Sequence, residues 1–199
     1  MSSDGVNTTR RRFLATATSV VGAGGVVGVA VPFVGSWNPS AKAKAAGAPV
    51  KFDVSKLEVG QMAVVEWRGK PVYVMRRSES DLASLEGLDS HLKDPESSTS
   101  DQPAYVSGRE RAIRQDIMVM VGLCTHLGCA PKFKPEVGSV PTPDGSEWIG
   151  GFFCPCHGSM FDLAGRVYKG VPASENLVVP PYMYESDGVI VIGVDQEAA

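Results

Sequence analysis

The larger part of the chain lacks the excess of basic side chains that binding to nucleic acid requires. Residues 51–199 carry 14 Lys/Arg against 21 Asp/Glu, whereas residues 1–50 carry five Lys/Arg against a single Asp. An acidic surface repels a phosphate backbone, so we expect no nucleic-acid partner. A basic head is instead typical of a segment retained on the cytoplasmic side of a membrane. Hydrophobic residues make up 43% of the 199 residues, which is enough for one domain with a core plus an appendage.

Charged residues are absent between Phe13 and Ala41. A helix over residues 13–37, at ~1.5 Å per residue, is longer than the ~30 Å hydrocarbon core of a bilayer. We therefore predict one transmembrane helix over residues 13–37, with Trp37 at the far interface. A cleaved signal peptide is the alternative, because Ala41-Lys42-Ala43 resembles a cleavage site, but the length of the run favours a retained anchor.

The residues before this run carry an export motif. Thr9-Arg10-Arg11-Arg12-Phe13-Leu14 is similar to a twin-arginine signal, with Arg10 and Arg11 as the arginine pair; the alternative is the basic region of an ordinary signal peptide. Because arginines stay inside, residues 1–12 are expected in the cytoplasm and the body of the chain outside it. Residues 38–49 are rich in Ser, Ala, Lys and Gly without an apolar period, so we predict a flexible hinge there.

Short strand patterns separated by turns fill most of residues 50–199. Two of them, Met62–Trp67 and Pro71–Arg76, flank Arg68-Gly69-Lys70 and predict a hairpin. The body is therefore predicted to be mostly antiparallel β, with further strands at 50–53, 117–121, 148–153, 165–169, 177–179, 183–185 and 189–194.

Helix is expected only once in the body. Ser78 is in the position to cap a short helix over residues 79–85. The following polar segment, 86–116, is predicted to be a long loop of the kind that often forms an interaction surface. Its histidine, His91, is interpreted as an exposed residue without a special role.

Cysteine and histidine are scarce, with four and three residues, but they are concentrated in two motifs. These are Cys124-Thr125-His126-Leu127-Gly128-Cys129 and Cys154-Pro155-Cys156-His157-Gly158-Ser159, which hold all four cysteines and two of the three histidines. A Cys₂His₂ zinc site would leave two cysteines unexplained, and two disulfides would leave the histidines unexplained. A two-iron, two-sulfur centre with two thiolates on one iron and two imidazoles on the other takes one cysteine and one histidine from each motif. The remaining Cys129 and Cys156 can form a disulfide, so this reading uses all six residues.

The two motifs, with their spacing, resemble those of the Rieske iron–sulfur subunit of bacterial cytochrome bc1 complexes, the ubiquinol–cytochrome c reductases. The resemblance extends to the twin-arginine anchor, the Ala-rich hinge and the Gly170-Val171-Pro172 turn, which is similar to the proline loop of the family. It implies a Rieske-type antiparallel β domain over residues 50–199, made of stacked small sheets with the cluster-binding loops at its tip. The cluster-binding subdomain would cover about residues 122–175, and one N-terminal transmembrane helix would precede the domain.

One [2Fe-2S] cluster is the cofactor that the resemblance implies. Carried over by position, Cys124 and Cys154 would bind the inner iron, and His126 and His157 would bind the outer iron through Nδ1. Because neutral imidazoles replace two thiolates, such a centre is easier to reduce than an all-cysteine one.

Other residues would support this cluster. Cys129 and Cys156 would form a disulfide between the loops. The hydroxyl of Ser159 would donate to a bridging sulfide, and Leu127 with the proline turn would shield the cluster from water. Phe161 occupies the position at which the family often has a tyrosine that donates to a cysteine sulfur, so we expect a lower potential than in members with both donors.

The resemblance implies an enzyme subunit of a quinol–cytochrome c oxidoreductase that contributes to proton translocation. His157, or alternatively His126, would hydrogen-bond the hydroxyl of ubiquinol and accept its proton, and the electron would pass to cytochrome c1. The implied partners are the cytochrome b and cytochrome c1 subunits of a dimeric complex. That complex would lie in the bacterial inner (plasma) membrane, with this single-pass chain placing the cluster domain in the periplasm. The alternatives are the Rieske small subunit of an exported oxidase of the arsenite oxidase type, a stand-alone electron carrier and a zinc-stabilised binding module.

Overall fold

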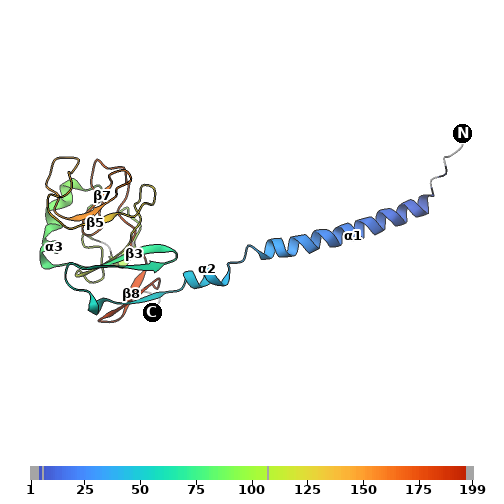
Figure 1. The fold of residues 1–199 in the computed structure, drawn as a ribbon, viewed down its shortest axis with the longest axis horizontal. Coiled ribbons are helices and arrows are strands. Elements are labelled where there is room, and N and C mark those ends of the chain that lie inside the picture. Colours follow the sequence, from blue (N-terminus) through green and yellow to red (C-terminus); the bar gives the residue numbers. More distant parts are fainter. Residues whose placement is uncertain (1–4, 6, 107, 196–199) are drawn as a thin grey trace. The chain divides into compact units, whose positions relative to one another are not determined.

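The computed structural model describes residues 5, 7–106 and 108–195 (Figure 1). The predicted N-terminal segment 1–12 therefore lies partly outside the described residues. Contacts divide the chain into two units, Met1–Ala45 and Ala46–Ala199, which are treated separately below.

The first unit consists of α1 (Thr8–Gly35) and most of the short helix α2 (Ala41–Ala46). The side chain of Asn7 accepts a hydrogen bond from the backbone N–H of Arg10 and caps α1. The arginines, which are good helix formers, therefore lie inside the helix, and α1 begins five residues before the predicted start at Phe13. No side chain of α1 is buried, and the helix is long and apolar enough to cross a membrane.

The second unit holds three sheets of three strands each, and every strand pair is antiparallel. This confirms the predicted mostly antiparallel β body. The first sheet has the order β1-β9-β8, formed by Val50–Asp53, Val189–Ile192 and Tyr182–Ser186. The second has the order β2-β3-β4, formed by Met62–Trp67, Lys70–Arg76 and Ile117–Val121. The third has the order β5-β6-β7, formed by Lys132–Lys134, Gly151–Phe153 and Met160–Phe161.

The predicted hairpin is confirmed, with a two-residue turn. Arg68 and Gly69 both have positive φ angles, 52° and 69°, and Trp67 pairs with Lys70. Two left-handed residues in a row are typical of a turn whose twist matches that of the flanking strands. The predicted cap is also present, because Ser78 and Asp81 form a reciprocal capping box at α3 (Glu79–Ser84).

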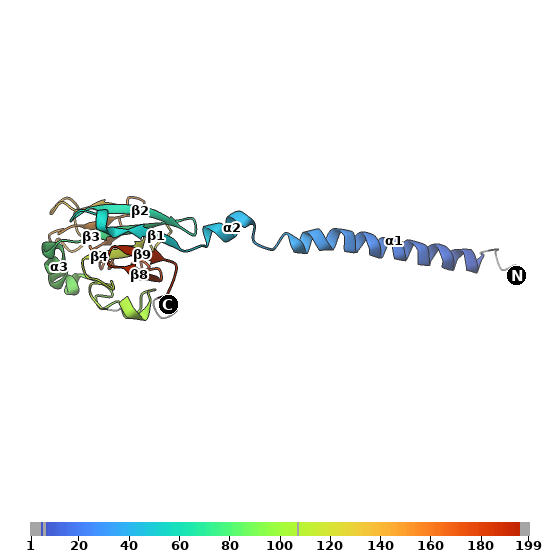
Figure 2. The same ribbon diagram turned by 90° about the horizontal axis from the view of Figure 1, so that it is seen from below.

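Strand β4 explains how the sheets stack. All five of its residues are buried, and the side chains of the first four alternate between two hydrophobic clusters. Met118 and Met120 pack in the cluster that contains the third sheet, whereas Ile117 and Val119 pack against residues of the first sheet. A strand that is covered on both faces has an uninterrupted apolar sequence, which is the pattern at 117–121. Figure 1 shows β3 between β5 and β7 on one side and β8 on the other, and Figure 2 shows the first two sheets stacked.

Some predicted elements are wrong in detail. Residues 165–169 and 177–179 form no strands: Val167 and Tyr168 make only isolated bridges, to Phe161 and Leu92. The strand expected at 148–153 shortens to Gly151–Phe153, because Gly150 adopts a positive φ angle of 101° just before it.

The segment 86–116 is not a plain loop. It contains the 3₁₀ helices η2 (Glu86–His91) and η3 (Ala104–Val106), and a third one, η1 (Val54–Lys56), follows β1. His91 is half-buried rather than exposed, and its Nδ1 lies 2.5 Å from a carboxylate oxygen of Asp144. This contact joins the segment to the long connection between β5 and β6, so the expectation that His91 is exposed is wrong.

Candidate metal centre

The first motif forms a closed loop between β4 and β5. The N–H of Gly128 donates to the carbonyl of Cys124 at 2.9 Å, and the N–H of Cys124 donates to the carbonyl of Cys129 at 2.8 Å. Gly128 has a φ of 79°, which a residue with a Cβ rarely adopts, so the glycine is what lets the loop close.

The second motif forms the same loop between β6 and β7. The N–H of Gly158 donates to the carbonyl of Cys154 at 2.9 Å, and the N–H of Cys154 donates to the carbonyl of Ser159 at 2.8 Å. Gly158 has a φ of 77°. The two motifs are therefore matched in backbone as well as in residue type, and each presents a buried cysteine at its first position, Cys124 and Cys154.

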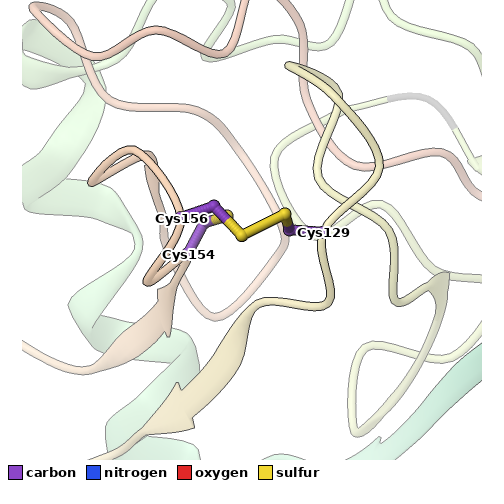
Figure 3. Close-up of side chains that lie close together, drawn as sticks. All are labelled: Cys129, Cys154 and Cys156. Atoms are coloured by element: carbon purple, nitrogen blue, oxygen red, sulfur yellow. A yellow bond between two sulfur atoms is a disulfide. The ribbon is translucent and has the colours of Figure 1, made fainter.

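A disulfide joins the two loops. Cys129 and Cys156 are bonded, with their Cα atoms 6.6 Å apart (Figure 3). Cys124 and Cys154 are free, which rules out the two-disulfide reading of the motifs. Figure 3 shows Cys154 beside Cys156, facing Cys129 of the first loop, and the three sulfur atoms lie within 4.8 Å of one another.

The two free thiols form the buried side of the site. Cys124 is 4% exposed and Cys154 is 1% exposed. Burial raises the pKa of the Cys154 thiol, and the neighbouring Cys124 raises it further, so in the absence of a metal the neutral thiol is favoured. Binding to a metal removes such a proton, and a pair of close, buried thiols is therefore suited to a metal and not to a solvent-exposed role.

The two histidines lie together at the outer side. The ring centroids of His126 and His157 are 4.8 Å apart and the rings are nearly perpendicular. His157 is exposed, whereas Nδ1 of His126 is buried without a hydrogen-bond partner among the described residues. A buried unpartnered nitrogen costs about 1–3 kcal/mol, a cost that a metal bond would remove. Two thiols and two imidazoles are the donors of a mixed-ligand two-iron, two-sulfur centre, so the residues present fit that group.

Ser159 lies directly beside this donor set. It is fully buried, and its Oγ accepts a hydrogen bond from the N–H of Ala173 at 3.0 Å. A hydroxyl has one hydrogen to donate, and because Oγ is the acceptor here, that hydrogen stays available for another partner. Leu127, next to His126 in the chain, is 71% exposed, so its apolar side chain lies on the surface.

Phe161 is fully buried on β7 and belongs to the same hydrophobic cluster as Cys124 and Cys154. A buried ion pair follows directly after β7: Nε of Arg166 donates to a carboxylate oxygen of Asp162 at 2.7 Å. Arg166 also donates to Asp89 and to the carbonyl of Leu85. The buried ion pair therefore connects the exit of the second loop to the segment that follows α3.

Several residues of the site were not expected from the sequence. Thr125 donates through Oγ1 to the carbonyl of Glu175 at 2.6 Å and fixes the first loop to the chain beyond the proline turn. Lys93 donates to two carbonyls of that turn. Thr125 lies inside the first motif, but its spacing gave it no role there, and Lys93 belongs to no sequence pattern that would have singled it out. Arg10 and Arg11 of the export motif lie in α1, outside this site.

Two matched loops on small stacked antiparallel sheets, each with a cysteine and a histidine and joined by a disulfide, define a Rieske-type iron–sulfur protein. Comparison with known families agrees. A family described as "Rieske [2Fe-2S] domain" matches residues 49–182, and one described as "Ubiquitinol-cytochrome C reductase Fe-S subunit TAT signal" matches residues 1–40.

Individual relatives cover nearly the whole chain. The ubiquinol-cytochrome c reductase iron-sulfur subunit of Allochromatium vinosum is 54% identical over 100% of this chain and 95% of its own length. The subunit of the same name from Blastochloris viridis is 43% identical over 96% and 97%. Among solved structures, one titled "Hyperthermophilic respiratory Complex III" aligns with a TM-score of 0.47 at 27% identity, over 88% of this chain and 98% of that chain.

The chain therefore belongs to the family of Rieske iron–sulfur subunits of ubiquinol–cytochrome c reductase. Its cofactor is one Rieske-type [2Fe-2S] cluster.

Proposed function

We propose that this chain is the iron–sulfur subunit of a quinol–cytochrome c oxidoreductase, which accepts one electron and one proton from ubiquinol and passes the electron to cytochrome c1. The observation that carries the proposal is the difference in burial across the donor set. The free thiols are buried, whereas Leu127 of the first loop and His157 of the second loop are exposed. The names of the relatives, which share 54% and 43% identity with the chain, support this function over that of another exported oxidase.

Within the site, Cys124 and Cys154 would hold the cluster on its buried side, and His126 and His157 would hold it through Nδ1 on its outer side. When bound, the cluster supplies a one-electron acceptor, whose potential is high because two of its four protein ligands are neutral. The buried, unpartnered Nδ1 of His126 and the two free thiols support this assignment.

The exposed imidazole has a second task in this proposal. With its Nδ1 engaged on the inner side, His157 presents Nε2 to solvent, where it would accept a hydrogen bond and then the proton from a quinol hydroxyl. His126 is the alternative acceptor. The exposed side chain of Leu127 would pack against the apolar face of the quinol pocket and exclude water from it.

The rest of the chain would place this site at the membrane surface. In our proposal residues 1–12 stay in the cytoplasm, residues 13–37 cross the bacterial inner membrane and residues 38–49 form a hinge. The domain 50–199, with its cluster-binding part at about 122–175, would then lie in the periplasm and dock on the cytochrome b and c1 subunits of a dimeric complex. The apolar α1 and the match of residues 1–40 to a twin-arginine signal support this arrangement.

The proposal is tested by deleting the gene for this chain and assaying membranes. We expect ubiquinol-dependent reduction of cytochrome c to disappear, and to return when the intact chain is supplied. A complex purified by a tag on the chain should contain b and c haems in the same fraction. A tagged chain that elutes with a molybdenum enzyme, or without haem, would contradict the proposed function.

A further inference from the structure

The turn over residues 170–173 covers the second loop of the metal centre. Its last residue, Ala173, is fully buried and donates its N–H to Oγ of Ser159. The orientation of the Ser159 hydroxyl therefore depends on the orientation of a single peptide group, the one that joins Pro172 to Ala173.

Lys93 holds the two peptide groups on either side of that one. Its Nζ donates to the carbonyl of Val171 at 2.8 Å and to the carbonyl of Ala173 at 2.5 Å. These carbonyls belong to the peptide groups 171–172 and 173–174. The peptide group 172–173 lies between two fixed neighbours, and the ring of Pro172 restricts φ at the same point.

The backbone of Lys93 is itself anchored to the cluster-binding part of the domain. Its N–H donates to the carbonyl of Val167 at 3.0 Å. The next residue, Asp94, is buried and accepts hydrogen bonds from the side chains of Ser98, Thr99 and Ser100, so the chain folds back around its carboxylate. The ammonium group of Lys93 thus reaches the turn from a fixed base.

We propose that Lys93 is a positioning residue for the [2Fe-2S] site. By fixing both neighbours of the peptide group 172–173, it holds the N–H that engages Oγ of Ser159 and keeps the hydroxyl hydrogen directed into the site. Loss of this tether lets the turn rotate, and the hydroxyl hydrogen is then shared with other acceptors. This inference rests on the proposed role of Ser159 as a donor to the cluster.

The test compares substitutions of two lysines by the cluster potential of the purified complex. Lys93→Met keeps the length of the side chain and removes the donors and the charge. Lys169→Met is the matched control, because Nζ of Lys169 donates to the carbonyl of Ser90 in the adjoining segment and makes no hydrogen bond to the turn. We expect Lys93→Met to disfavour reduction about threefold, which for a one-electron couple is a fall of about 28 mV. Lys169→Met should leave the potential unchanged, and Lys93→Arg, which keeps charge and donors, should restore it.

Repeating the Lys93→Met substitution in a Ser159→Ala chain separates the proposed positioning effect from a simple effect of the lysine charge. If Lys93 acts through Ser159, Lys93→Met should cause no further fall in a Ser159→Ala chain, whereas an effect of charge alone would cause the same fall in both backgrounds. An undiminished fall in Ser159→Ala, or an equal fall in Lys169→Met, overturns the inference. If Ser159→Ala itself leaves the potential unchanged, the proposed role of Ser159 fails, and the inference about Lys93 fails with it.

Should Lys93→Met assemble without its cluster, Lys93→Gln keeps an N–H donor for one carbonyl and should give a smaller fall that also vanishes in Ser159→Ala. A potential of Lys93→Gln equal to that of the wild type would then overturn the inference.

Discussion

Phe161→Tyr should raise the reduction potential of the cluster. Phe161 is fully buried on β7, in the hydrophobic cluster that contains Cys124 and Cys154. A hydroxyl added in such surroundings costs about 1–3 kcal/mol unless it finds an acceptor, and a cysteine sulfur that carries negative charge is the acceptor expected there. A donor to that sulfur stabilises the reduced, more negative state more than the oxidised state.

The size of the shift follows from ordinary hydrogen-bond energies. A bond to a charged group contributes about 1.5–3 kcal/mol and a neutral one about 0.5–1.5 kcal/mol, so a difference of about 1 kcal/mol between the two redox states is reasonable. For a one-electron couple, where 59 mV corresponds to a factor of ten, this is about 40 mV. The assay is a redox titration of the intact complex, followed by the spectrum of the reduced cluster.

Phe152→Tyr is the matched control for this substitution. Phe152 is equally buried and pairs with Phe161 across β6 and β7, but its ring packs on Tyr73 and Phe133. The Phe152→Tyr substitution should lower the stability of the fold without raising the reduction potential of the cluster. A Phe161→Tyr chain with an unchanged potential, or an equal rise in Phe152→Tyr, would refute the reasoning.

Three further predictions concern stability. Cys129→Ser removes a disulfide that spans 27 residues, and chain-entropy arguments give a loss of about 3.5 kcal/mol, measurable by denaturant unfolding together with faster loss of the cluster. At Asp94, burial acts to raise the pKa, but hydrogen bonds from Ser100, Thr99 and Ser98 outweigh it and lower the pKa to about 2. The pKa of Asp94 in the unfolded chain is about 3.9, so Asp94 stabilises the fold above pH 4 and loses this effect as the pH falls through about 2. Wild type should be more stable than Asp94→Asn by about 2 kcal/mol at pH 7. In urea titrations this difference should shrink as the pH is lowered from about 4 to about 2. Arg166→Met leaves the buried carboxylate of Asp162 without its ion-pair partner and should cost about 3–5 kcal/mol of stability. Arg109→Met, at a partly exposed pair with Asp89, should cost much less, and similar unfolding midpoints for the two variants would contradict this.

The metal centre was predictable because its information is local. Cysteine, glycine and histidine lie within six residues in each motif, and the hydrogen bonds that close each loop join residues four and five apart. The strands that were predicted correctly, such as 117–121, have either an uninterrupted or an alternating apolar pattern. Residues 177–179 have such a pattern as well, but Val178 accepts a single hydrogen bond from the N–H of Val121 at the edge of the second sheet. The N–H groups of Leu177 and Val179 donate to the carbonyls of Gly165 and Asp101, so no continuous strand pairing forms.

The supporting residues could not be predicted, because their partners are distant backbone atoms. Lys93 lies in a polar segment and is exposed, as expected of a lysine there, so nothing in the sequence indicates that its Nζ donates to the carbonyls of Val171 and Ala173. Arg111 and Arg77 are almost fully buried, and burial lowers the pKa of each guanidinium to about 10. Arg111 donates to the carbonyls of Ala164 and Leu177, which are groups that every residue has. No pattern in the sequence distinguishes such an arginine from one on the surface.

The division between a buried and an exposed side of the site follows from the way each loop closes. The hydrogen bond from the first residue to the sixth brings both ends of the loop to its base, so Cys124, Cys154 and Ser159 are buried there. The fourth residues, Leu127 and His157, then lie at the apex, where both are exposed. The burial of the thiols and the exposure of the imidazole are consequently set by position within a six-residue loop and do not require a hydrophobic signal at either. A histidine moved to the first position would face the core, and a cysteine moved to the fourth would face solvent, so the order of residues in the two motifs determines which donor is buried and which is exposed.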